Sequence, residues 1–118
     1  MRGLRGERER AVERIDDAAE ADERVLDHLA RLGCDLAKSR ESRHFLYLPE
    51  RIDADAVAEA LEGDGWLTSI ERSERAWLVT AKRVSELTPD VVRQTRALLE
   101  ALASARGGVY DGWEATAS

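Results

Sequence analysis

The chain has 118 residues, of which 43% are hydrophobic and 36% are charged, and this balance suits one compact globular domain. Its 18 Lys and Arg residues and 24 Asp and Glu residues give a formal net charge of -6, which works against non-specific attraction to phosphate backbones or anionic lipid. We therefore expect neither nucleic acid nor a membrane as a direct partner.

Cysteine content and the N-terminal sequence bear on the compartment. Cys34 is the only cysteine, so an intramolecular disulfide is excluded, and with it a secreted disulfide scaffold. Glutamates interrupt the segment where a signal peptide would need an unbroken apolar stretch. No apolar run approaches the roughly 18 to 20 residues that span a bilayer. These features predict a cytoplasmic protein.

The first predicted element is a helix from Glu7 to Leu32, because this segment has no proline and its apolar residues recur at helical spacing. Gly33 would end it. Asp22 falls on the apolar face, however, and an unbroken helix of this length would measure about 39 Å. We therefore expect either a break between Asp16 and Asp22 or an arm that projects from the body.

Runs of consecutive apolar residues predict the central strands. Ser42 to Leu48 contains four such residues in succession, and Ala76 to Val84 contains three. Such runs suit strands that are buried on both faces. The segment from Trp66 to Glu71 is more polar, as an edge strand allows, and only a short turn separates it from the strand that follows. These two segments are therefore predicted to form an antiparallel hairpin.

Capping residues predict two further helices. Asp53 is expected to begin the first, and glycines near residue 63 to end it. Thr88 followed by Pro89 is expected to begin the second, which a glycine pair ends. The segment from Val109 to Ala115 then reads as a last extended strand with a turn or bulge in its middle.

The resulting order after the first helix is β-α-β-β-α-β, which predicts an α+β, two-layer ferredoxin-like sandwich with an additional N-terminal helix. The first and third strands would be central neighbours and the other two would be edges. We assign residues 1–20 to an N-terminal helical extension and residues 21–118 to a single domain. The two crossover helices cover only one sheet face. The N-terminal helix, a second copy of the chain or a protein partner is expected to cover the other.

The most unusual motif is Tyr110-Asp111-Gly112-Trp113-Glu114, which places two aromatic residues around an acidic turn. It has two interpretations. Tyr and Trp are favoured in binding hot spots, so the motif suits a recognition patch. The same residues suit a structural role in which the aromatic rings attach the last strand to the sheet and Asp111-Gly112 makes a bend. The two interpretations do not exclude each other.

Together with this motif, two more segments carry a family resemblance. They are the turn Gly33-Cys34-Asp35 leading to Arg43-His44-Phe45-Leu46-Tyr47-Leu48, and the pair Gly65-Trp66. From about Asp22 to Glu114 the chain resembles the regulator of ribonuclease E activity B family, RraB. Glu114 stands where many relatives have glycine or another residue. The resemblance implies a non-catalytic protein of ferredoxin-like fold that binds ribonuclease E and restrains RNA decay.

The sequence thus predicts a binding regulator whose partner, by resemblance, is a ribonuclease E type endoribonuclease. The residues expected to bind the partner lie in the last strand and its neighbour: Tyr110, Asp111, Trp113 and Glu114, with Arg43 and His44 second. The alternative is a ferredoxin-like module that binds a small ligand or a second copy of the chain as a homodimer. A closed pocket lined by Trp66 and Trp77 would favour the ligand.

Other chemistries find little support. Cys34, Asp35 and His44 lack any local signature of a nucleophilic enzyme. The two histidines, His28 and His44, have no ligand spacing for zinc. Loops that cradle phosphate are absent, and a sheet that reads RNA needs basic surroundings. We expect no catalytic residue, no metal and no cofactor.

Overall fold

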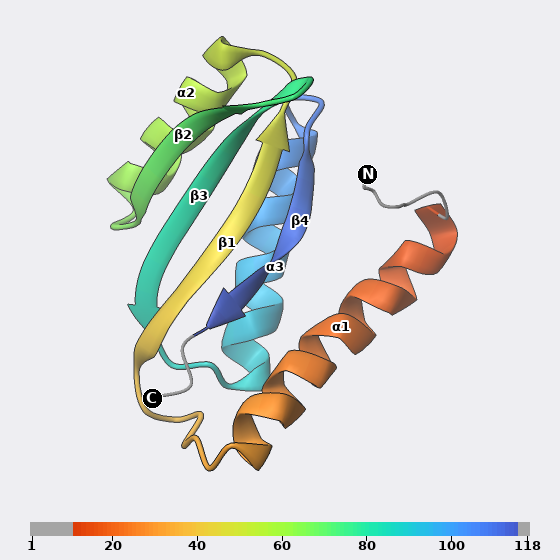
Figure 1. Cartoon of the computed structure of the whole chain (residues 1–118), viewed down its shortest axis with the longest axis vertical. Coiled ribbons are helices and arrows are strands. Elements are labelled where there is room, and N and C mark those ends of the chain that lie inside the picture. The colour runs from red at the N-terminus through yellow and green to blue at the C-terminus, as the bar shows by residue number, and fades with distance from the viewer. Residues whose placement is uncertain (1–10, 116–118) are drawn as a thin grey trace.

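The computed structural model describes residues 11–115, with side chains from residue 20 onward. In this part of the chain, three helices and four strands make an α+β structure (Figure 1). In chain order the elements are α1 (Ala11–Arg31), β1 (Arg40–Leu48), α2 (Arg51–Gly63), β2 (Leu67–Ser73), β3 (Ala76–Ser85), α3 (Pro89–Ser104) and β4 (Val109–Ala115).

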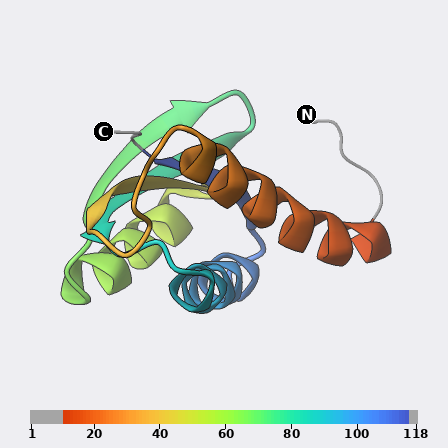
Figure 2. The ribbon, with the colours of Figure 1, turned by 90° about the horizontal axis from the view of Figure 1, so that it is seen from below.

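The four strands form one antiparallel sheet in the order β2-β3-β1-β4. As the apolar runs predict, β1 and β3 are the central strands, and β2 and β4 are the edges. Helices α2 and α3 pack side by side against one face of the sheet (Figures 1 and 2). We call this the helix-covered face, and the opposite face the open face.

The main core lies between the sheet and the helices α2 and α3. Every second residue of β1 is buried there, because side chains of a strand alternate between the two faces. Full burial of a Leu or Val side chain contributes about 1.5–3 kcal/mol. The large side chains that are almost fully buried in this core are Leu46, Leu48, Val57, Leu61, Trp66, Val79 and Leu99.

Helix α1 runs from Ala11 to Arg31 without interruption, so the predicted break between Asp16 and Asp22 was wrong. It would measure about 31 Å, and its N-terminal part extends away from the sheet, as the alternative of a projecting arm predicts (Figure 1). The helix continues through residue 20, where we placed a boundary; that division stays a prediction. An unbroken helix is tolerated because Asp22 has a buried charged partner, described below.

The C-terminal half of α1 packs beside β4 and α3. Leu26 and Leu29 form a second small core with Leu87 and Val92. Figure 2 shows α1 beside the β4 edge of the sheet, not across its open face. Of the three alternative covers that the sequence predicts for the open face, the N-terminal helix is therefore wrong for the part of α1 that the structure describes. Its apolar side chains are used against α3 instead.

Of the two helix-capping residues that the sequence predicts, Asp53 and Thr88, only Thr88 is confirmed. Thr88 caps α3 as predicted, because its hydroxyl accepts a hydrogen bond from the Val91 N–H at 3.4 Å, and Pro89 follows. Helix α2 begins at Arg51, so the prediction that Asp53 caps it was wrong. Glu50 is the N-cap, and its extended backbone directs its carbonyl to the N–H of Asp53 without help from a side chain.

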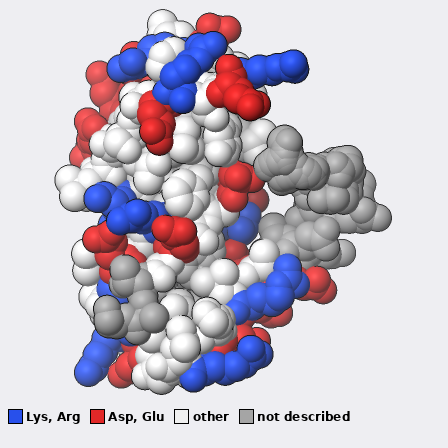
Figure 3. Space-filling view, in the orientation of Figure 1, with Lys and Arg blue, Asp and Glu red and all other residues white. Residues whose placement is uncertain are grey.

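The open face carries apolar side chains from all four strands and is not covered by any described helix. The register places Tyr47 beside Leu78 and Phe45 beside Thr80 on this face. Figure 3 shows a largely uncharged surface over the sheet between groups of charged side chains. Three apolar residues there are strongly exposed: Leu67 at 69%, Val84 at 64% and Val109 at 54%. Of the covers that the sequence predicts, a second copy or a protein partner remain.

Gly108 offers a direct test of how closely β4 approaches β1. A Cβ at this position would meet the Tyr47 carbonyl and lie 2.7 Å from Leu48 Cδ1, whereas a Cβ at Gly63 would meet nothing within 4 Å. We predict that Gly108→Ala lowers the free energy of unfolding by about 1–3 kcal/mol through overpacking. Gly63→Ala should leave it unchanged or raise it slightly. Urea denaturation measures both, and equal stability of the two variants would contradict this packing.

Candidate functional site

The Tyr110 to Glu114 motif contains a bulge that turns both of its aromatic rings to the helix-covered face. Tyr110 lies opposite Leu46, and Trp113 lies opposite His44, so the register shifts between these two pairs. Residues three apart on a regular strand would point to opposite faces. The extra residue of the bulge turns Tyr110 and Trp113 to the same face of the sheet. Gly112 permits this backbone conformation, with a φ of +103°. The predicted bend at Asp111-Gly112 therefore brings both rings inside.

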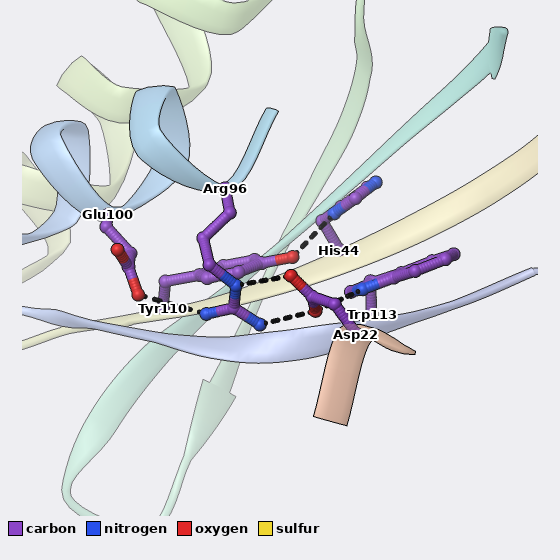
Figure 4. A network of polar contacts seen from close by, with 6 residues as sticks. All are labelled: Asp22, His44, Arg96, Glu100, Tyr110 and Trp113. Carbon is purple, nitrogen blue, oxygen red and sulfur yellow. Dashed lines mark hydrogen bonds and ion pairs between the residues drawn. The ribbon is translucent and has the colours of Figure 1, made fainter. Parts of the chain in front are cut away.

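A buried ion pair joins α1 to α3 beside these rings (Figure 4). Both oxygens of Asp22 accept hydrogen bonds from Arg96, through Nε and Nη2, each at 2.8 Å. The two side chains are only 10% and 17% exposed. Trp113 Nε1 donates to Asp22 Oδ1 at 2.9 Å, which adds β4 to the same carboxylate. One aspartate thus holds α1, α3 and β4 together.

The contacts continue from Arg96 into the centre of the sheet. The guanidinium of Arg96 lies 4.9 Å from the centre of the Tyr110 ring, a cation–π distance, and also pairs with Glu100 at 2.9 Å. The Tyr110 hydroxyl is 2.8 Å from His44 Nδ1, and Ser42 Oγ is 3.1 Å from His44 Nε2. We call the residues of Figure 4 together with Ser42 the polar network.

Burial sets the protonation states in this network. Burial and the positive charges of Arg83 and Arg96 lower the pKa of His44 from 6.5 to about 3, so its imidazole is neutral near pH 7. Burial also raises the pKa of the Tyr110 phenol, although Arg96 opposes this. For Arg96, burial acts to lower the pKa, but the hydrogen bond and the charge of Asp22 outweigh it and raise the pKa. Arg96 therefore keeps its charge.

The contact between Ser42 and His44 has the residue types of a nucleophile and its base, but both side chains are buried. Ser42 is 1% exposed. The cavity beside the pair has a volume of about 10 Å³, which is room for about one water molecule. A histidine with a pKa near 3 is also a weak base at neutral pH. The pair is positioned for packing and hydrogen bonding.

The structure separates the predicted partner-binding residues into two groups. Tyr110 and His44 are buried and Trp113 is half-buried, all in the polar network. The exposed members are Arg43, Asp111 and Glu114. Arg43 lies next to Glu114 on the open face, with 4.0 Å between the charged atoms. That any of the six binds a partner stays a prediction.

Four residues of the network, Ser42, Glu100, Asp22 and Arg96, are not among the site residues that the sequence predicts, and the last two form its main contact. Asp22 was noticed only as an obstacle to a long helix, and Arg96 gave no signal among many surface charges. A charged residue on an otherwise apolar helix face is the signal that could have identified the site, because a buried charge needs a partner. The partner itself, 74 positions away, follows only from the fold.

A closed pocket lined by Trp66 and Trp77 would favour a small ligand, but the two tryptophans have different surroundings in the structure. Trp66 is buried in the core, where the guanidinium of Arg83 lies 4.1 Å from its ring centre. The guanidinium groups of Arg51 and Arg72 lie 5.2 Å and 5.1 Å from the ring centre of Trp77. Among the described residues, no group of three or more His, Cys, Asp or Glu could hold a metal ion. No helix in the same part of the chain is long and apolar enough to cross a membrane.

Removal of Asp22 should destabilise the protein because it leaves Arg96 buried without its partner. We predict that Asp22→Ala lowers the free energy of unfolding by about 3 kcal/mol. Asp22→Ala combined with Arg96→Met should be more stable than Asp22→Ala alone, since no unpaired charge remains. Glu20→Ala breaks an exposed pair with Arg24 and should cost about 0.5 kcal/mol at most. Urea denaturation measures the free energy of unfolding. An equal loss in all three variants would show that the buried pair does not hold α1 in place.

Acid should destabilise the fold through His44. Its folded pKa of about 3 lies below the ordinary 6.5, so below pH 6.5 the unfolded chain binds this proton more readily. The contribution of neutral His44 is therefore complete above pH 6.5 and is lost as the pH falls toward 3. Between about pH 7 and about pH 4.5, the native protein should lose more stability than His44→Gln. His28→Gln, at an exposed position, is the control. If the free energy of unfolding of His44→Gln fell with pH as steeply as that of the native protein, this role of His44 would be refuted.

Comparison with known families assigns the chain. Residues 19–115 match the family described as regulator of ribonuclease activity B, RraB. The match includes Asp22, Arg96 and the whole Tyr110 to Glu114 motif. Among curated proteins, a search finds no significant match. The resemblance seen in the sequence is thereby confirmed, and the chain belongs to the RraB family of regulators of ribonuclease activity.

Proposed function

We propose that this protein is a non-catalytic regulator that binds a ribonuclease E type endoribonuclease through its open face and so restrains RNA decay. The family supports a role in regulating ribonuclease activity. The observation that carries the mode of action is the uncovered apolar surface of the sheet. A regulator that works by contact needs such a surface and needs no reactive group.

The open face has the composition of a protein-binding surface. Phe45, Tyr47 and Leu78 are half-buried at its centre, and more exposed apolar residues flank them. Aromatic residues are enriched at the centre of protein interfaces, and charged residues are depleted there. Contiguous exposed apolar patches on soluble proteins commonly mark interaction sites. This supports a protein partner for the face that α1 leaves uncovered.

The exposed residues of the sequence motif border this surface. Arg43 and Glu114 face one another across β1 and β4, and Arg43 also pairs with Glu41 at 3.4 Å. Exposed charges at a rim contribute little binding energy but select the orientation of the partner. We therefore assign Arg43, Asp111 and Glu114 to the rim of the contact. His44, Tyr110 and Trp113 would act indirectly, by holding β4 in its place.

The fold is consistent with the same proposal. The strand order β2-β3-β1-β4, with α2 and α3 on one face, supports the predicted ferredoxin-like arrangement. We propose that α1 is an addition that strengthens the β4 edge and leaves the open face accessible. A second copy of the chain would use the same face, and the experiment below separates the two occupants.

Loss of the aromatic side chains of the open face should weaken binding to the ribonuclease. We predict that Phe45→Thr/Tyr47→Thr reduces the affinity for a purified ribonuclease E type enzyme at least about tenfold, because central aromatic residues are typical hot spots. Threonine suits a strand, so the fold should remain intact. The matched control is Ile52→Thr/Leu98→Thr, which removes two exposed apolar side chains from the helical layer.

Calorimetric titration measures the affinity, and sedimentation of the free protein measures self-association. Equal affinity of native protein and Phe45→Thr/Tyr47→Thr would overturn the assignment of the open face. A native dimer that this variant converts to a monomer, without any ribonuclease binding, would favour the second copy. A regulator is expected to inhibit RNA cleavage by the ribonuclease as native protein, and Phe45→Thr/Tyr47→Thr should lose this inhibition together with the affinity.

A further inference from the structure

A groove is lined by residues from the C-terminal half of α1 and the first turns of α3. Figures 1 and 2 show these two helices beside and behind the β4 edge of the sheet, away from the open face. Its volume is about 560 Å³, within the range of about 300–1,000 Å³ that is typical of ligand sites. The position of α1, and hence the width of the groove, depends on the Asp22–Arg96 ion pair.

The inner surface of this groove is apolar. Leu26 and Val92, which are almost fully buried, face it from the two helices, and the half-buried Leu36 and the exposed Pro89 border it. Ala30, a small exposed residue of α1, also lines the groove. An apolar side chain inserted here would bury its surface against four apolar residues.

The charges along the groove leave an excess of negative charge. Asp22 is matched by Arg96, and Arg93 is matched by Asp90. Glu23 and Asp27 also line the groove, and neither forms an ion pair with any residue that the structure describes. They are four positions apart on one face of α1, where like charges repel. A bound cation would relieve that repulsion.

We propose that this groove binds a basic amphipathic helix of a partner protein, with its apolar side chains on Leu26, Leu36 and Val92. Arginine or lysine residues of that helix would pair with Glu23 and Asp27. Apolar grooves between helices commonly accept amphipathic helices in this way. The proposal concerns a second surface and does not depend on the function assigned to the open face.

The test uses a synthetic fluorescent helical peptide of alanine, leucine and arginine, with leucine on one face and arginine beside it. Fluorescence anisotropy against the full chain measures binding. We expect Glu23→Gln/Asp27→Asn to weaken binding about fivefold, as loss of two exposed ion pairs implies, and to reduce its dependence on salt. The control Glu59→Gln/Glu74→Gln changes the net charge equally at exposed positions outside the groove and should bind like native protein.

A second variant tests the groove by filling it. Ala30→Arg places a long cationic side chain in the lining of the groove and should abolish binding of the peptide while α1 stays helical. The same peptide with glutamate in place of arginine should not bind native protein. Equal weakening by the groove variant and the control variant would show attraction to net charge only and would overturn the proposal. Absence of binding by native protein would overturn it as well, whatever the outcome with the ribonuclease.

Discussion

The ion pair between Asp22 and Arg96 is the interaction on which the arrangement of the molecule most depends. The small core that joins α1 to α3 and the segment before it contains four buried side chains among the described residues. Unlike the apolar contacts, the two buried charges must stay paired, because displacement of one leaves the other buried without a partner at a high cost in free energy. Trp113 ties β4 to the same pair, because its Nε1 donates a hydrogen bond to Asp22. Sheet edge, α3 and α1 are thereby fixed in one geometry.

This geometry reconciles the two interpretations of the Tyr110 to Glu114 motif. The bulge at Gly112 turns the aromatic residues toward Arg96 and His44, while Asp111 and Glu114 remain at the surface. The structural interpretation fits the rings, and the recognition interpretation is left to the exposed charges beside the open face. The residues of this motif are contiguous in the sequence, but its aromatic rings lie on the helix-covered face of β4 and its acidic side chains are exposed.

Much of the fold could be predicted from local patterns. Apolar runs located both central strands, and Thr88 with Pro89 located the start of α3. The site could not be predicted in the same way, because its main contact joins residues 74 positions apart. Asp22 looked like a break in the helix until the fold supplied its partner. Likewise, periodicity showed that α1 has an apolar face but not whether the sheet or α3 would bury it.

The central claim is that the motif's rings are structural and that binding occurs on the open face. Hydroxyl-radical footprinting of side chains, with and without the ribonuclease, tests both parts in one measurement. The account predicts that Phe45 and Tyr47 are oxidised in the free protein and protected in the complex. Tyr110, which is only 9% exposed, should react little in either state. Strong oxidation of Tyr110 in the free protein, with protection confined to it and Trp113, would contradict the account.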